Sequence, residues 1–141
     1  MNSWMWVALA AGAAVLALLA ARRLTGRRSP TLADVVADGL AEIWARRLGV
    51  PQDRIRPALH GQDSALQGRV GDQVGKVACT FRQEPDAERR HLVQVVLDCD
   101  YRDGGSERVT MRTPWRRVPS DVRTELLRPG TGEAVRTWTP A

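Results

Sequence analysis

The sequence predicts an α+β domain that follows a single membrane-spanning helix, and three observations lead to this fold class. An uncharged apolar run opens the chain, an amphipathic helical pattern follows it, and several later segments carry apolar residues at every second position. The expected domain is an antiparallel meander of four or five strands packed against an N-terminal amphipathic helix and a short C-terminal helix. We divide the chain into a transmembrane anchor over residues 1–24, a basic juxtamembrane linker over 25–30 and a soluble α+β domain over 31–141.

The apolar run over residues 4–21 predicts the transmembrane helix. Its residues rise by about 1.5 Å each, so the run covers roughly 27 Å, close to the thickness of the hydrocarbon core of a bilayer. A cleaved signal peptide and a soluble core helix are the alternatives. A secretory signal carries positive charge before its apolar region, whereas residues 1–3 carry none, so the pattern favours a retained signal anchor.

The residues at the two ends of this run predict its orientation. Arginines follow it at once, and arginine beside a transmembrane helix favours the cytoplasmic side, where anionic headgroups also attract it. Indole rings at the other end suit the headgroup level. Six residues are expected at the membrane interface: Trp4, Trp6, Arg22, Arg23, Arg27 and Arg28. The expected location is the inner (cytoplasmic) membrane, with the N-terminus outside and the domain in the cytoplasm.

Small residues in the apolar run keep self-association through the anchor open. Ala13, Ala17 and Ala21 recur at every fourth position, and Ala8 with Gly12 forms a second such pair. This spacing permits the close approach of two helices in lipid.

The charge balance argues against a nucleic-acid-binding domain. The chain carries 21 basic and 16 acidic residues, and without the four arginines of the membrane interface 17 and 16 remain, a net charge of +1. Binding to phosphate backbones requires a dense cationic surface. A membrane-tethered nucleic-acid-binding protein is therefore an alternative only, and it requires one patch formed by Arg112, Arg116, Arg117 and Arg123.

Two segments of the domain predict helices. Apolar residues at helical spacing predict the first helix over residues 31–48, with a hydroxyl cap at Ser29–Thr31 and a left-handed end at Gly49. Residues 50–64 are expected to form an irregular connection. The second helix is expected over 118–127, since Pro119 and Ser120 suit its start and Pro129–Gly130 its end.

Alternating apolar and polar residues predict the strands. Three segments have one apolar face each: residues 76–82, 92–101 and 108–112. A shorter strand over 65–70 is expected before them, joined through a turn at Gly71 and Asp72 that places Leu66 opposite Val77. Residues 133–139 are expected to return as a final edge strand.

A three-residue loop at Asp103–Gly105 predicts the register of the sheet. The expected pairs across the first seam are Cys99 with Val109, Leu97 with Met111, Tyr101 with Glu107 and Asp100 with Arg108. The expected pairs across the second seam are Val77 with Leu97 and Lys76 with Asp98. Both Asp98 and Asp100 then gain a cation on the outer face.

The two cysteines are expected to be core thiols. Cys79 and Cys99 lack the C-x-x-C spacing of metal or redox motifs, and both fall on apolar strand faces in a compartment expected to be reducing. A disulfide is expected only if the domain lies outside the cytoplasm. A catalytic pair of Cys79 with His91 has no third member in view.

The remaining polar motifs also favour structural roles. Asp98 and Asp100 share a strand face, but their expected cations disfavour a metal site. His60 is expected to be an exposed surface histidine. The glycines at 68, 71 and 75 suit hairpin turns, since the stretch runs into a strand where a phosphate loop would lead into a helix. Residues 115–117 are expected to be a packed tryptophan with solvated arginines, not a contact for RNA or lipid.

The sequence thus predicts no catalytic residue, no cofactor and no metal site. It favours a single-pass accessory or scaffolding subunit whose domain binds a protein partner of a membrane-associated complex. Strand addition could occur at the edge over residues 65–70 or beside Val135. An enzyme with an unrecognised site is the further alternative, and it requires a concave pocket that gathers His60 or His91 with carboxylates.

Overall fold

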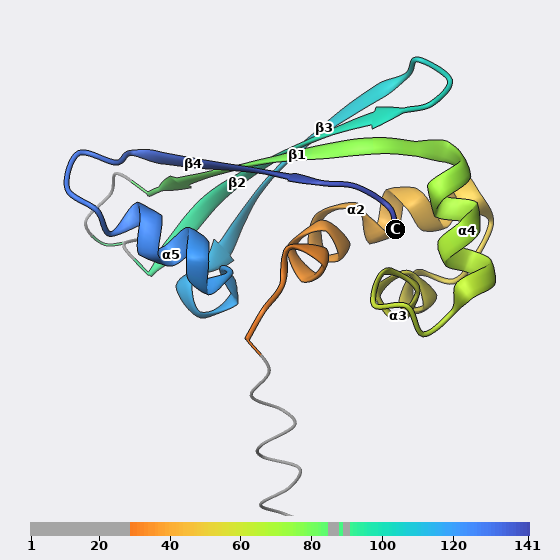
Figure 1. The fold of residues 1–141 in the computed structure, drawn as a ribbon, viewed down its shortest axis with the longest axis horizontal. Coiled ribbons are helices and arrows are strands. Elements are labelled where there is room, and N and C mark those ends of the chain that lie inside the picture. Colours follow the sequence, from red (N-terminus) through yellow and green to blue (C-terminus); the bar gives the residue numbers. More distant parts are fainter. Residues whose placement is uncertain (1–28, 85–87, 89–90) are drawn as a thin grey trace, which may run out of the picture.

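The computed structural model of the chain describes residues 29–84, 88 and 91–141 and shows an α+β fold (Figure 1). In chain order the elements are α2 (Leu32–Leu48), the 3₁₀ helix η1 (Gln52–Arg54), α3 (Ile55–Leu59), α4 (Ser64–Gln73), β1 (Val74–Gln83), β2 (Leu92–Tyr101), β3 (Ser106–Pro114), the 3₁₀ helix η3 (Trp115–Arg117), α5 (Ser120–Leu126) and β4 (Glu133–Trp138). The predicted fold class of the domain is confirmed.

The predicted anchor over residues 1–24 lies outside the described residues, as do its interface residues Trp4, Trp6, Arg22, Arg23, Arg27 and Arg28. Among the residues that the structure describes, none of the helices combines the length and the apolar character needed to cross a bilayer.

The sheet is antiparallel throughout, with the strand order β3-β2-β1-β4. The first three strands form the predicted meander, and β4 returns to pair with β1, so β3 and β4 are the two edges. All four α-helices lie on one side of the sheet in Figure 1, and the described chain begins on that side, at Ser29. None of the described helices covers the opposite face of the sheet.

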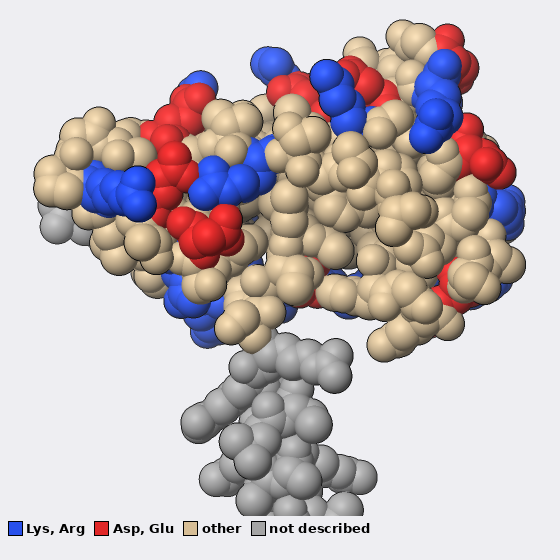
Figure 2. All heavy atoms as spheres, in the orientation of Figure 1, with Lys and Arg blue, Asp and Glu red and all other residues tan. Residues whose placement is uncertain are grey.

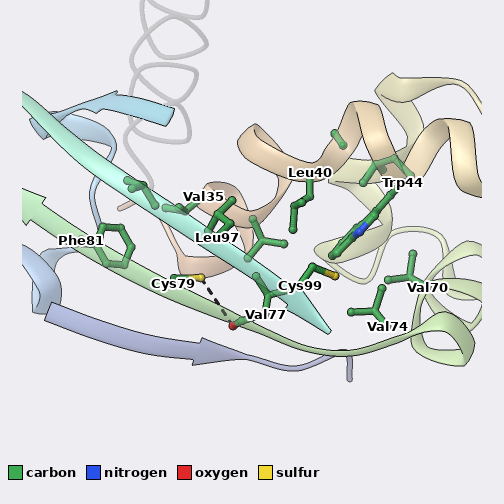
Figure 3. Packing of buried hydrophobic residues seen from close by; sticks show 14 of the residues in the cluster. Val35, Leu40, Trp44, Val70, Val74, Val77, Cys79, Phe81, Leu97 and Cys99 are labelled. Carbon is green, nitrogen blue, oxygen red and sulfur yellow. Dashed lines mark hydrogen bonds between the residues drawn. The ribbon is translucent and has the colours of Figure 1, made fainter. Parts of the chain in front are cut away.

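The core fills the space between α2 and the covered face of the sheet (Figure 3). Leu40 and Trp44 of α2 point toward inward-facing strand residues such as Leu97, and all three are at most 1% exposed. Alternate strand residues point inward because the side-chain period of a strand is two. The burial of β2 follows this alternation along nearly its whole length.

Helix α2 agrees with its predicted bounds because both of its ends are specified locally. The hydroxyl of Thr31 accepts from the backbone N–H of Asp34 at 3.4 Å, and the carboxylate of Asp34 accepts from the backbone N–H of Thr31 at 2.9 Å. This capping box satisfies two amides that the helix start would leave unpaired. Gly49 ends the helix with φ +68°, a left-handed conformation that glycine adopts without strain.

The predicted strand over residues 65–70 is wrong, since this segment belongs to helix α4. Asp63 caps α4 by accepting from the backbone N–H of Leu66 at 3.1 Å. Leu66 and Val70 lie four residues apart, and both are buried on one face of the helix. The predicted turn at Gly71 and Asp72 therefore lies inside the helix, and the preceding connection contains two further short helices, η1 and α3.

The predicted register is also wrong, by two residues at each seam. Across the first seam the pairs are Leu97 with Val109, Val95 with Met111, Asp98 with Arg108 and Cys99 with Glu107. Across the second seam they are Val77 with Cys99 and Lys76 with Asp100. The hairpin loop is displaced by one residue, because the backbone N–H of Tyr101 donates to the carbonyl of Gly105 at 2.8 Å and closes the loop over residues 102–104. A shift of two residues leaves every side chain on its predicted face, so the alternation could not reveal it.

The C-terminal segment agrees with its prediction as a short helix followed by an edge strand. Arg136 of β4 joins these elements, with Nε 3.0 Å from the carboxylate of Asp121 and Nη2 2.7 Å from that of Glu125. Both carboxylates belong to α5.

Candidate functional site

A broad open cleft of about 980 Å³ lies where the described chain begins. Its walls come from segments that are far apart in the sequence. It is lined by Ser29, Pro30, Thr31, Asp34, Arg56, His60, Gln62, Arg116, Arg117 and Arg123. Figure 2 shows basic side chains on the lower surface beside the start of the described chain. The cleft therefore gathers cations from α3, η3 and α5 around the first turn of α2.

Two of the four arginines are held by aspartates of α2. Arg56 donates to Asp34 with Nη1 at 3.0 Å from Oδ1, and it also pairs with Asp38. Arg117 donates to the same Asp38 through Nε at 3.1 Å and Nη2 at 2.9 Å from Oδ2. Such forked contacts fix the planes of both guanidinium groups.

His60 completes this network at the end of α3. Its Nε2 lies 2.8 Å from Oδ1 of Asp34, and its side chain is 31% exposed. Burial acts to raise the pKa of Asp34, but hydrogen bonds from Thr31 and His60 together have the larger, opposite effect. The pKa of Asp34 therefore lies below its usual value. Burial lowers the pKa of Arg56, and its bonds to Asp38 and Asp34 raise it above the usual value. Asp34 and Arg56 are thus charged at neutral pH.

The other two arginines have no ion pair within the described ranges. Arg116 lies in the exposed turn η3. Arg123 extends from α5, and its Nε is buried without a hydrogen-bond partner among the described residues. A buried donor without an acceptor is destabilising. Among the described residues the cleft therefore carries excess positive charge, which suits an anion.

The nucleic-acid alternative requires four arginines in one patch, and the structure brings together three of them. Arg116, Arg117 and Arg123 line one cleft, but Arg112 does not, since its Nε donates to the carboxylate of Glu84 at 3.1 Å. The predicted packing of Trp115 is confirmed, since its side chain packs against the core.

The histidines differ from their predicted settings. His60 is not an isolated surface side chain, because it contacts Asp34 and both residues line the cleft. The enzyme alternative requires such a concave pocket with a histidine and a carboxylate. His91 is exposed, and its backbone carbonyl accepts from the amide of Trp115 at 2.9 Å. The pocket was missed because Asp34 and His60 are 26 residues apart in the chain.

The strand carboxylates have exchanged their predicted partners. Asp98 accepts from Nε of Arg108 at 2.6 Å, whereas Asp100 lies opposite Lys76. Within the described part of the chain, no group of three or more His, Cys, Asp or Glu side chains could hold a metal ion.

Both cysteines are free and completely buried, as predicted. The thiol of Cys79 points toward the carbonyl of Val77 at 3.9 Å (Figure 3). Burial raises the pKa of Cys79 to about 12 and also raises the pKa of Cys99. Neither thiol is an activated nucleophile, since activation requires a lowered pKa.

This burial predicts slow chemical modification. At pH 8, a small thiol reagent is expected to modify Cys79 and Cys99 of the folded full chain in neutral detergent about a hundredfold more slowly than in urea. Absorbance of the released thiolate reports the rate. A Ser64→Cys variant is the control, because position 64 is exposed and should react at once. Fast stoichiometric modification of the folded wild type would contradict the burial.

Comparison with models of protein families, with curated proteins and with solved structures finds no match, so the function of this chain has to be inferred from its own residues.

Proposed function

We propose that the chain is a single-pass membrane-anchored accessory protein whose α+β domain binds an extended segment of a partner protein at the free edge of β4. The proposal has two halves, an anchor and a binding edge. The anchor rests on the apolar run over residues 4–21 and the arginines behind it. The linker of residues 25–30 is short, so the domain is confined near the bilayer, where its effective concentration for membrane partners is high.

One observation carries the binding half, namely the exposure of Val135 in the middle of β4. Its side chain is 52% exposed, one of only two large apolar residues so exposed in the described part of the chain. An edge strand with an exposed apolar residue can pair with another chain. Strand addition at β4 supplies backbone hydrogen bonds, and Val135 supplies an apolar contact.

The opposite edge of the sheet is better protected. Strand β3 carries the exposed Arg108 and Arg112 and ends at Pro114, which lacks an N–H. Charged residues and proline are the usual means by which proteins prevent pairing at an edge. Between the two edges, β4 is therefore the better candidate.

An added strand would extend an existing row of side chains on the uncovered face. Val135 lies opposite Thr80, which lies opposite Val96, which in turn lies opposite Thr110 on β3. Nη1 of Arg136 already donates to the carbonyl of Val135 at 2.8 Å. A carbonyl oxygen has two lone pairs, so it can accept a second bond from an incoming amide.

Val135→Lys is expected to reduce the amount of co-purified partner about tenfold, since a lysine on an edge strand opposes pairing. The readout is affinity purification of the full chain in mild detergent followed by quantitative mass spectrometry. Thr110→Lys is the matched control, since it adds the same charge in the same row at the other edge. A chain that emerges alone, or equal losses with both variants, would contradict the binding half.

The anchor is tested separately by carbonate extraction and by a C-terminal reporter that is active only in the cytoplasm. Mature protein that begins after residue 21, recovered free of membranes, would contradict the anchor.

A further inference from the structure

We propose that the arginine-lined cleft binds the phosphate group of an anionic lipid headgroup. This inference rests on the membrane anchor of the proposed function, but it concerns a different surface from the β4 edge. In Figure 1 the described chain begins on the helix side of the sheet, opposite the uncovered face. The domain can therefore meet the bilayer with one face while the other remains open.

The charge balance of the cleft favours an anion. Four arginines line it, and the carboxylates that contact them belong to Asp34 and Asp38. Two positive charges of the cleft therefore have no countercharge in the ranges that the structure describes. Guanidinium groups bind phosphate oxygens through two parallel N–H donors, which makes arginine well suited to this ligand.

The four arginines divide into two that are fixed and two that are available. Arg56 and Arg117 are oriented by the aspartates of α2. Arg116 and Arg123 have no carboxylate partner within the described residues, and Nε of Arg123 is buried without an acceptor. Because Arg123 lines the cleft, a phosphate group bound there would lie beside its guanidinium group. The aspartates hold the site in shape before the anion arrives, which lowers the entropic cost of binding.

The cleft lies close to the predicted anchor along the chain, which favours a lipid headgroup as the source of the phosphate. Ser29 and Pro30 form part of its lining. Only four residues, 25–28, lie between Ser29 and Leu24, the last residue of the predicted anchor, and the five residue steps of an extended chain cover at most about 18 Å. If the anchor spans the bilayer, the cleft lies at headgroup level. Anionic lipids of the cytoplasmic leaflet are concentrated there.

The test is a titration of the full chain in neutral detergent micelles. Three probes are added in turn: short-chain phosphatidylglycerol, short-chain phosphatidylcholine and inorganic phosphate. Nitrogen-15 resonances of the arginine Nε groups report binding at each guanidinium, and calorimetry gives the affinity. We expect phosphatidylglycerol to shift the Arg116 and Arg123 resonances with saturation, and we expect the zwitterionic lipid to leave them unchanged.

Arg116→Ala is expected to weaken phosphatidylglycerol binding about tenfold, the usual loss for one charge-assisted contact. Arg116 is exposed and unpaired among the described residues, so its removal should preserve the fold, which circular dichroism checks. Arg128→Ala is the matched control. Arg128 is exposed just beyond α5 and outside the cleft, and its removal changes the net charge equally.

Equal weakening by the two variants would overturn the site, because diffuse attraction to net charge would then explain the binding. Saturation by inorganic phosphate at the same concentration as the lipid would overturn the lipid source. The titration does not depend on whether the chain spans a bilayer or binds at β4. Failure of carbonate extraction or of the Val135→Lys experiment is therefore distinguishable from failure of this proposal.

Discussion

Trp44→Ala is expected to lower the free energy of unfolding by about 3–5 kcal/mol, the usual loss for a large aromatic side chain in a core. Trp44 is 1% exposed and is the largest of the fully buried side chains. It lies on α2, and its ring packs against that of Trp138 with the centroids 5.7 Å apart. The substitution therefore leaves a cavity and also releases the end of β4 from α2.

Trp44→Phe is the matched control. It keeps an aromatic ring against Trp138 and removes less volume, so a loss of about 1–2 kcal/mol is expected. Urea unfolding of the full chain in neutral detergent, followed by circular dichroism, gives both values. A loss below 1 kcal/mol for the alanine variant, a threshold far under the usual range, would show that Trp44 does not join α2 to the sheet.

Gly39→Ala is expected to destabilise the domain by about 1–3 kcal/mol, although alanine is normally the better residue inside a helix. Gly39 lies where α2 packs tightly against side chains of the sheet. A Cβ at this position would overlap Cδ1 of Leu97 and lie 3.3 Å from Sδ of Met111. Leu97 is 0% exposed, so its side chain cannot move aside without disturbing the core.

Gly68→Ala on α4 is the control, and it is expected to raise the free energy of unfolding. No atom lies within 4 Å of a Cβ at this position, so the ordinary helix propensity applies and a gain of about 0.5–1 kcal/mol is expected. The same urea titration measures both variants. If Gly39→Ala were also stabilising, the close approach of α2 to Leu97 would be wrong.

Elements specified by short-range patterns could be predicted from the sequence. Helix α2 has a capping residue at Thr31, a glycine stop at Gly49 and an apolar stripe between them, and these local signals agree. The strands are recognised by their period of two, which also places Cys79 and Cys99 in the core. The period specifies the face of a residue but not its cross-strand neighbour, since the hairpin loop decides the register.

Helix α4 could not be predicted in the same way because its sequence is ambiguous. It is only ten residues long and contains glycines at 68 and 71, which lower helix propensity and suggest a hairpin. The burial of Leu66 and Val70 against the rest of the domain outweighs this local preference. The signal that could have revealed α4 was Asp63, which has the capping position before a pair of apolar residues spaced by four.

The cleft could not be predicted because it depends on tertiary structure. Arg117 and Asp38 are 79 residues apart, and Arg56 and Asp38 are 18 apart. Each arginine taken alone is typical of a solvated surface position. Their convergence on the first two turns of α2 follows from the packing of α3, η3 and α5 around the start of that helix, which composition and spacing do not reveal.

The extended backbone at Thr31, with φ −105° and ψ 168°, has a mechanical consequence for the whole chain. A helix that arrives from the bilayer cannot run through this residue into α2, since helical dihedral angles are interrupted there. If residues 4–21 span a bilayer as proposed, the anchor would therefore not form one continuous helix with α2. In that case the tilt of the domain over the lipid surface would be decided by the contacts that the domain itself makes there.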